Sequence, residues 1–315
     1  MTIKLYTQYL LRVIIMLMVR NRSREKGIDA TVYRIAEKKI LNPTVIQLLI
    51  EAPMVAKKAL PGQFVILRVH EDGERIPLTV AGTDRERGLV KIIFQVVGAT
   101  TEMLSHKNEG EYITDFAGPL GTPTHLEGLG KVCIVGGGVG CAIAMPIAEK
   151  LHEMGAEVTS IIGFRSRDLL ILEDEFKTCS NSLTVMTDDG SYGRKGNVTL
   201  PLREMLEAGE SFDMIITIGP LIMMKFVVET ARPFGTPVTV SMNPIMIDGT
   251  GMCGGCRLTL TRDGKSITKF ACVDGPDFNG YEVDFDEAMS RGRMYADRER
   301  HAHEATCNLF NKEVR

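Results

Sequence analysis

The stretch KVCIVGGGVG at residues 131–140 decides the fold of this chain. Residues 131–135 have strand length and are apolar after Lys131, a glycine run follows, and residues 142–153 carry apolar side chains at helical spacing. A glycine-rich turn between a strand and a helix lets a phosphate approach the free amide groups at the helix N-terminus. The stretch therefore predicts a dinucleotide-binding α/β unit, with a tight turn that binds nothing as the alternative.

The glycine pattern also bears on which dinucleotide this unit binds. It departs from the G-x-G-x-x-G fingerprint because Cys141 stands at the sixth position. The departure favours a nicotinamide dinucleotide over a flavin in this part of the chain.

Strand and helix signals alternate after the glycine turn. Apolar strands are predicted at residues 157–162, 183–186 and 214–218, and helices at residues 198–206 and 221–231. Such alternation is typical of a parallel, doubly wound sheet, because parallel strands need helical crossovers between them.

Short β-rich runs separated by turns precede the glycine stretch. Strands are predicted at residues 44–50, 63–69 and 89–97, with turns at Pro61-Gly62 and Asp72-Gly73. Short strands at this spacing indicate an antiparallel β-barrel or sandwich.

The composition is that of an ordinary globular protein of 315 residues, long enough for several domains. The chain has 37 Lys and Arg against 40 Asp and Glu, and its net charge of -3 argues against a nucleic-acid partner. Its seven cysteines form no disulfide-like framework, so we expect a reducing, cytoplasmic compartment. The apolar run at residues 9–19 contains Arg12 and is too short to span a bilayer. We interpret it as an appended helix or an overlong predicted start, and prefer this to an interfacial membrane helix or a signal segment.

The sequence accordingly predicts a multi-domain fold. Its expected parts are an N-terminal extension (1–29), an antiparallel β-barrel (30–125), a doubly wound α/β nucleotide domain (126–236), a small Cys- and Gly-rich unit (237–290) and a C-terminal tail (291–315).

The most specific motif is Asp248-x4-Cys253-x2-Cys256-x15-Cys272. Plant-type two-iron clusters use Cys-x4-Cys-x2-Cys and a distant fourth Cys, and here Asp248 stands in the first position. The surrounding glycines permit a loop that wraps closely and aims its amide groups at sulfur. The spacing favours a [2Fe-2S] cluster over a zinc site or unliganded thiols. Asp248 is expected to be a ligand, with a cap on the glycine turn as its alternative role.

A weaker motif, Arg75-Ile76-Pro77-Leu78-Thr79, lies in the predicted barrel. An arginine pairs bidentately with a pyrophosphate, and a threonine hydroxyl suits a phosphate or the polar edge of a flavin. In isolation, a surface arginine before an edge-strand proline is the default interpretation of the motif. The turn Gly98-Ala99-Thr100-Thr101, about one strand later, strengthens the binding interpretation.

Together these features resemble a known family. A barrel with R-x-P-L-T, a glycine-rich nucleotide domain and a C-terminal two-iron loop are similar to the small, flavin-carrying subunits of NADH-dependent reduced ferredoxin:NADP oxidoreductases, also called sulfide dehydrogenases. Broader relatives are the ferredoxin-NADP reductase-like flavoproteins and the electron-transfer subunits of dihydroorotate dehydrogenase. The resemblance spans about residues 31–293 and is most specific at residues 242–254. The dihydroorotate relatives generally have Cys where Asp248 stands, which favours the first group.

The resemblance implies two nucleotide cofactors. For FAD it implies Arg75, Pro77, Leu78, Thr79, Phe94, Gln95, Val96, Gly98, Thr100 and Thr101. For NAD(H) it implies Gly136, Gly137, Gly138, Gly140, Asp189, Gly190, Ser191, Gly219 and Pro220. The nicotinamide type stays open, because Arg165 and Arg167 suit the 2'-phosphate of NADP(H), whereas the resemblance favours NAD(H).

The implied activity is that of an NAD(P)-dependent flavin and iron-sulfur oxidoreductase without a side-chain general base. Its implied partner is a larger flavin and iron-sulfur subunit in a heterodimer, and the complex exchanges electrons with ferredoxin. One form of this complex in the family bifurcates electrons. No membrane span is expected. The electron-transfer subunit of dihydroorotate dehydrogenase is the closest alternative, and a zinc-stabilised nucleotide-binding adaptor without redox activity is the alternative from another class.

Overall fold

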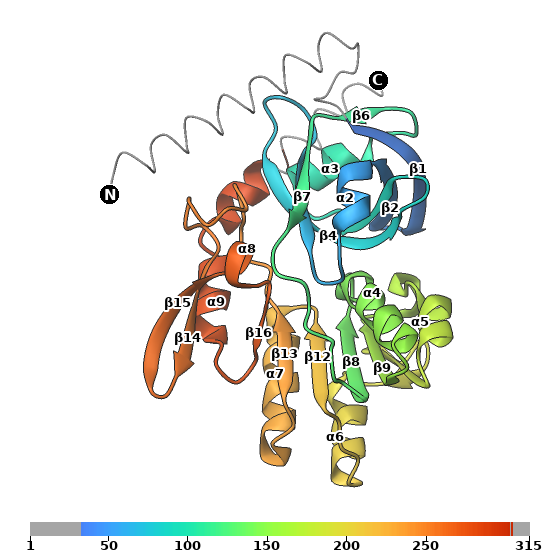
Figure 1. Cartoon of the computed structure of the whole chain (residues 1–315), viewed down its shortest axis with the longest axis vertical. Helices are drawn as coiled ribbons and strands as arrows, with labels where there is room; N and C mark the ends of the chain where they lie inside the picture. The colour runs from blue at the N-terminus through green and yellow to red at the C-terminus, as the bar shows by residue number, and fades with distance from the viewer. Residues whose placement is uncertain (1–32, 303, 305–315) are drawn as a thin grey trace.

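The computed structural model describes residues 33–302 and residue 304. Its strands form a seven-stranded antiparallel sheet, a seven-stranded, mostly parallel sheet and a two-stranded hairpin (Figure 1). The antiparallel sheet lies above the parallel one in this view, and the orange and red C-terminal unit lies beside them. The expected extension, residues 1–29, and the last part of the expected tail, residues 305–315, lie outside the described residues.

The antiparallel sheet curls around its own apolar core, in the order β6-β1-β2-β5-β4-β3-β7. Its elements are β1 (Tyr33–Asn42), β2 (Val45–Glu51), α2 (Pro53–Lys58), β3 (Phe64–Arg68), β4 (Arg75–Asp84), β5 (Leu89–Gln95), α3 (Ala99–Ser105), β6 (Tyr112–Ile113) and β7 (Asp115–Leu120). The strands predicted at residues 44–50, 63–69 and 89–97 are confirmed as β2, β3 and β5. The predicted barrel is therefore present.

The parallel sheet has the order β11-β10-β9-β8-β12-β13-β16. Its elements are β8 (Lys131–Gly137), α4 (Gly140–Glu153), β9 (Glu157–Phe164), η1 (Arg167–Leu169), α5 (Glu173–Cys179), β10 (Ser182–Thr187), β11 (Arg194–Lys195), α6 (Thr199–Glu207), β12 (Met214–Ile218), α7 (Leu221–Ala231), η2 (Arg232–Phe234) and β13 (Val238–Ser241). The chain proceeds outward from β8 to β10 and then returns to β12 on the other side of β8. The doubly wound prediction is confirmed, and its topological switch point, where such sheets bind ligands, lies between β8 and β12.

The C-terminal unit consists of a hairpin and short helices. Its elements are β14 (Arg257–Arg262), β15 (Lys265–Phe270), α8 (Ala271–Asp274), β16 (Asp277–Asn279) and α9 (Phe285–Gly292). β16 pairs antiparallel with β13 and so extends the nucleotide sheet. The expected boundary after residue 236 falls before β13, which pairs with β12 inside that sheet.

The apolar stretch at residues 269–273 predicts a strand from the sequence, and this prediction is wrong, because Cys272 lies in the helix α8. β15 ends at Phe270, whose backbone amide donates a 2.8 Å hydrogen bond to the carboxylate of Asp274. A side-chain acceptor four residues ahead satisfies an amide at the start of a helical turn, so the chain turns at Phe270 instead of extending.

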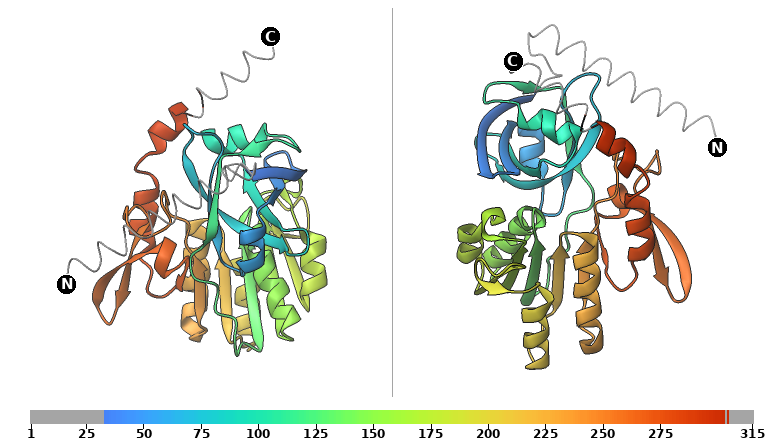
Figure 2. Two further views of the ribbon diagram at one scale, coloured as in Figure 1. Left: turned by 45° about the horizontal axis from the view of Figure 1, so that its top comes forward. Right: turned by 180° about the vertical axis from the view of Figure 1, so that it is seen from behind.

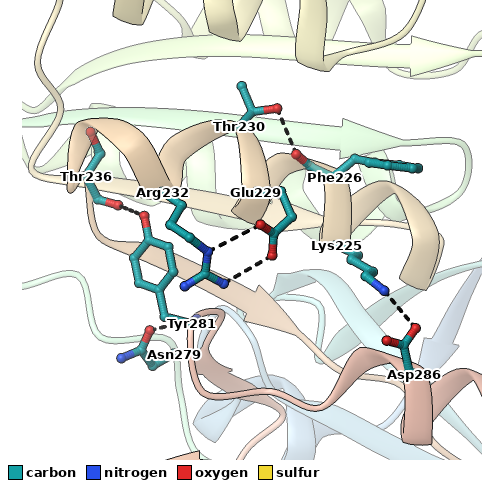
Figure 3. A network of polar contacts seen from close by, with 9 residues as sticks. All are labelled: Lys225, Phe226, Glu229, Thr230, Arg232, Thr236, Asn279, Tyr281 and Asp286. Carbon is teal, nitrogen blue, oxygen red and sulfur yellow. Dashed lines mark hydrogen bonds and ion pairs between the residues drawn. The ribbon is translucent and has the colours of Figure 1, made fainter.

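Polar contacts fix α7 of the nucleotide sheet to the C-terminal unit (Figure 3). Lys225 forms a 2.7 Å ion pair with Asp286 at the start of α9. Further along, the Arg232 guanidinium lies 4.9 Å from the ring centroid of Tyr281, whose hydroxyl donates to the carbonyl of Thr236. Figure 2 shows from behind how α7 and the C-terminal unit lie side by side. The unit is thus held along the length of this helix.

A second seam joins the C-terminal unit to the connection between the two sheets. The amide of Thr122 donates a 2.7 Å hydrogen bond to the carbonyl of Gly275, and the hydroxyl of Thr124 donates to the buried carboxylate of Asp277. Both threonines follow β7 directly, so the end of the barrel is anchored to residues of the C-terminal unit.

Within residues 33–302, no helix is long and apolar enough to cross a membrane.

Asp277 gives the stability of this seam a pH dependence. Burial raises the pKa of its carboxyl, and the hydroxyls of Thr124 and Ser241 oppose part of that rise. Because the folded protein holds this proton more tightly than the unfolded chain does, stability falls as pH rises from the unfolded pKa of about 4 toward the folded pKa. We expect Asp277→Asn, which has no proton to lose there, to flatten the loss of Tm with rising pH, as measured by circular dichroism. Asp72→Asn in an exposed turn is the control, and parallel Tm curves for wild type and Asp277→Asn would contradict the expectation.

Candidate functional site

A cavity of about 660 Å³ lies between the barrel and the switch point of the nucleotide sheet. Its lining comes from barrel strands, from the glycine turn after β8, from the start of α7 and from the segment after β13. Eight of the sequence-predicted residues meet there, namely Pro77, Thr79, Gln95, Gly137, Gly138, Gly140, Gly219 and Pro220. The structure therefore brings part of the expected FAD set and part of the expected NAD(H) set to one site.

Strand alternation sorts the expected flavin residues. Along β4, Pro77 and Thr79 line the cavity, whereas Leu78 between them packs against the barrel core. Along β5, Gln95 lines the cavity, while Phe94 and Val96 belong to the barrel core or pack against it. Successive strand side chains point to opposite faces, so every second residue of each motif supports the barrel instead.

The remaining expected flavin residues lie at the start of α3 and at the start of β4, away from the cavity lining. Thr101 Oγ1 accepts hydrogen bonds of 3.0 Å from the amides of Val97 and Gly98, and so holds the first turn of α3. The hydroxyl of Thr100 donates a 2.9 Å hydrogen bond to Glu74, the residue before Arg75. This hydrogen bond holds the start of α3 next to the start of β4, where Arg75 lies.

The glycine positions of the β8 turn differ in what a side chain there would meet. A Cβ on Gly140 would overlap the carbonyl oxygen of Ile218, and one on Gly137 would overlap the Met223 sulfur. Gly140 needs glycine because it meets the backbone at the end of β12, whereas at Gly137 the flexible Met223 side chain on α7 would have to move. Gly138 has a φ of +55° and no atom within 4 Å of where a Cβ would stand, so its open space faces the cavity that it lines. Gly136 is a buried strand residue behind them.

The expected residues after β10 lie outside the cavity lining. The carboxylate of Asp189 accepts hydrogen bonds from the hydroxyl and the amide of Ser191, at 2.6 and 2.9 Å, and these bonds lower its pKa. Gly190 lies between them at a φ of +78°, so the three residues form a compact turn. The neighbouring Asp188 lines the cavity, together with Arg165 from the end of β9.

Sequence reasoning missed three groups of lining residues. Asn42 and Thr44 lie in the turn between β1 and β2, where the Asn42 side chain donates a 3.0 Å hydrogen bond to the carbonyl of Leu169 in η1. The other groups are Ile222, Met223 and Phe226 on α7, and Met242, Asn243 and Met246 after β13. Their polar turn and apolar helix signals are too common to single out from sequence.

The predicted cluster ligands come from one loop and from α8. Cys256 and Cys272 are buried with their sulfur atoms 3.2 Å apart, and Cys253 is exposed. The carboxylate of Asp248 accepts hydrogen bonds of 2.8 Å from the amides of Thr250 and Cys253, which lower its pKa. Among the described residues, no three His, Cys, Asp or Glu side chains surround one metal-ion position.

The donor chemistry of this loop fits a two-iron cluster. Three thiols and a carboxylate lie within one loop and its adjoining helix, and the amide of Gly255 points at the Cys253 sulfur from 3.5 Å. Gly249, Gly251 and Gly254 have φ values of +73°, +81° and +66°, as a tightly wrapped loop requires. Burial, with the neighbouring Cys256 thiol, raises the pKa of Cys272 to about 12, so it is a bound iron that would keep this sulfur deprotonated.

The fold and the site together define a flavoprotein of the ferredoxin-NADP reductase type, with an iron-sulfur unit added at its C-terminal end. A family model described as the iron-sulfur cluster binding domain of dihydroorotate dehydrogenase B matches residues 243–284. A Thermotoga maritima protein named a homolog of the dihydroorotate dehydrogenase B (NAD(+)) electron transfer subunit is 51% identical, over 81% of this chain and 88% of that protein. The corresponding subunit of Desulforamulus reducens is 31% identical, over 74% of this chain and 90% of that protein. The chain belongs to this family of electron-transfer subunits and their homologues.

Solved structures agree with this membership. A chain of the NADH-dependent reduced ferredoxin-NADP oxidoreductase structure, reported for flavin-based electron bifurcation, is 49% identical with a TM-score of 0.80, covering 86% of this chain and 96% of that one. The ferredoxin reductase of carbazole 1,9a-dioxygenase, at 17% identity, shares the fold with a TM-score of 0.57 over 67% of this chain and 68% of its own.

These similarities confirm several expectations. The protein is an electron-transfer subunit of the flavin and iron-sulfur oxidoreductases, with FAD, a [2Fe-2S] cluster and NAD(H) as its cofactors. As a subunit of this kind it works in a complex with a larger partner. The non-redox adaptor alternative is wrong.

Gly138 offers a direct test of the dinucleotide site. Asparagine tolerates the left-handed conformation at this position, so Gly138→Asn should fold and project its side chain into the cavity. An intrusion worth about 1 to 3 kcal/mol weakens NADH binding about fivefold to a hundredfold. Isothermal titration of the dithionite-reduced protein with NADH measures the loss, because no hydride transfer then adds to the heat, and the FAD content of the purified protein stays unchanged.

Gly155→Asn is the matched control for this variant. Gly155 also has a positive φ, +86°, and open space around a Cβ, but it lies in the turn after α4, away from the cavity lining. Equal NADH affinity in the wild type and in Gly138→Asn would remove this turn from the nucleotide site.

Proposed function

We propose that this subunit moves electrons between NAD(H) and a larger flavin and iron-sulfur partner, through FAD on the barrel and a [2Fe-2S] cluster in the C-terminal loop. One observation carries the proposal: Thr79 and Gln95 of the barrel share a cavity with Gly138 and Pro220 of the nucleotide sheet. A flavin on the barrel and a nicotinamide at the switch point would therefore meet face to face.

The bound cofactors supply the redox chemistry, a hydride transfer between nicotinamide and flavin and single-electron transfer at the cluster. The chain supplies binding and alignment. The titratable side chains of the cavity lining are Arg165 and Asp188, both at the ends of strands in the nucleotide sheet. Their place suits contacts to a ribose, with Asp188 favouring the free hydroxyls of NAD(H) and Arg165 leaving NADP(H) open. No side-chain general base is assigned.

The complex we infer is a heterodimer that reaches ferredoxin through the larger subunit and bifurcates electrons. A subunit reported in that context is 49% identical and supports this inference, and the relative named a homolog of the dihydroorotate dehydrogenase subunit is 51% identical, so identity does not separate the two complexes. Asp248 in the first ligand position favours the bifurcating complex. We infer a reducing, cytoplasmic compartment, because the seven cysteines form no disulfide-like framework. Identification of the co-purifying partner by mass spectrometry decides between the two complexes.

Arg75 tests the flavin site. Its side chain is exposed and, within the described part of the chain, forms no hydrogen bond or ion pair, so the guanidinium is free to meet a pyrophosphate. Loss of a charged hydrogen bond of about 1.5 to 3 kcal/mol predicts about tenfold to hundredfold weaker FAD binding in Arg75→Ala. Fluorescence titration of the flavin-free protein measures it. Arg85→Ala, at an exposed site beyond β4, is the control, and unchanged FAD affinity in Arg75→Ala contradicts the assignment.

Asp248 tests the cluster ligands. If Asp248 is a ligand, the Asp248→Cys variant keeps a two-iron cluster with an altered electron paramagnetic resonance signal, and the Asp248→Ala variant loses iron. If Asp248 only caps the amides of Thr250 and Cys253, both variants keep the wild-type signal on reduction. Asp213→Ala is the matched control, because that carboxylate also accepts two backbone amides, from Gly130 and Lys131, in another part of the molecule. A wild-type protein without iron or flavin absorption overturns the proposed function itself.

A further inference from the structure

The predicted cluster loop meets the barrel at Gly249, the residue after Asp248. Gly249 has a φ of +73°, and a Cβ there would lie 2.7 Å from Leu120 Cδ1 and 2.8 Å from Ile66 Cδ1. Side-chain carbons do not approach that closely, so the backbone of this corner is seated directly on two barrel side chains.

Ile66 connects this corner to the cavity. It is fully buried in β3, and its register partner across the β3–β4 ladder is Pro77, which lines the cavity. Neighbouring strands lie about 4.8 Å apart, so a single strand separates the flavin motif from the cluster loop. Ile66 also shares one buried apolar cluster with Met246 and Cys256. A continuous packed layer therefore runs from the cavity to a predicted iron ligand.

We propose that Ile66 and Leu120 form a seat for the Asp248-Gly249 corner, and that this seat holds the flavin-facing side of the cluster dry and at a fixed place. The inference rests on the proposed function, because it assumes a cluster on Asp248, Cys253, Cys256 and Cys272. Ile66 and Gly249 are positioning residues: they act through the loop and touch neither cofactor.

The seat has a measurable electrostatic consequence. Reduction adds negative charge to the cluster, and water stabilises that charge better than methyl groups do. The reduction potentials of iron-sulfur clusters respond to solvent exposure and to hydrogen bonds on sulfur. Opening the seat admits water at the Asp248 side, and the midpoint potential of the cluster then shifts to a more positive value.

The first test truncates the seat from the barrel side. In Ile66→Ala we expect the midpoint potential of the cluster to shift to a more positive value. Electron paramagnetic resonance during a redox titration measures this shift. Ile50→Ala is the matched control, because Ile50 is also fully buried in the barrel but belongs to a core without cluster ligands. We expect no shift in that variant. Loss of iron confined to Ile66→Ala equally supports the seat, whereas equal effects in both variants overturn it.

The second test fills the contact from the loop side. Gly249→Ala places a methyl group against Ile66 and Leu120 and should shift the potential in the same direction. Gly264→Ala is the control for backbone strain, because Gly264 also has a φ of +73° but has no atom within 4 Å of a Cβ, at the tip of the β14–β15 turn.

A rescue separates the close contact from strain in the loop. Ile66→Val and Leu120→Val together remove the two Cδ1 atoms that the new methyl group would meet, and they leave the φ at residue 249 unchanged. We expect Gly249→Ala/Ile66→Val/Leu120→Val to return toward the wild-type potential. A wild-type potential in Gly249→Ala, or a shift that the two valine substitutions do not reverse, overturns the seat. A wild-type protein that contains no cluster instead overturns the proposed function, and its iron content reports this independently.

Discussion

The close approach of α4, β12 and α7 at Gly140 is the constraint on which the rest of the structure depends. A side chain at this position would overlap the carbonyl oxygen of Ile218, and one at Gly137 would overlap the sulfur of Met223. The absence of these side chains lets the start of α4 lie against the ends of the two central strands. Because α4 also packs against β4, the barrel comes to rest over the same edge of the sheet. The cavity exists where these elements converge.

The two sheets are held over that cavity from opposite ends. At one end the Asn42 side chain donates to the carbonyl of Leu169, which ties the first barrel turn to η1. At the other end the C-terminal unit bridges both sheets, through the β13–β16 ladder, the Lys225–Asp286 ion pair and the packing of Gly249 on the barrel. An exposed ion pair adds little stability by itself, so the strand ladder and the apolar contacts carry most of this connection.

This arrangement explains why an electron-transfer subunit needs few reactive side chains. The cavity lining is mostly glycine and apolar residues, with charge confined to Arg165 and Asp188 at its nucleotide end. Flavin, nicotinamide and cluster bring their own chemistry, and a protein that binds them contributes placement and polarity. The buried layer that contains Met246, Cys256 and Ile66 is therefore as much a part of the functional site as the cavity is.

The sequence by itself determined the features that depend on local spacing: the strand-glycine-helix turn at residues 131–153, the alternation of strands and helices, and the spacing of Asp248 and the three cysteines. Each of these is set by neighbours along the chain. Tertiary structure decided which residues of a motif face the cavity, as with Thr79 against Leu78, and it selected Asp188 over Asp189. It also placed Cys272 on a helix and β16 in the nucleotide sheet. These outcomes depend on pairing and burial between segments far apart in the chain, where many partners satisfy the same local pattern and the packed core selects one.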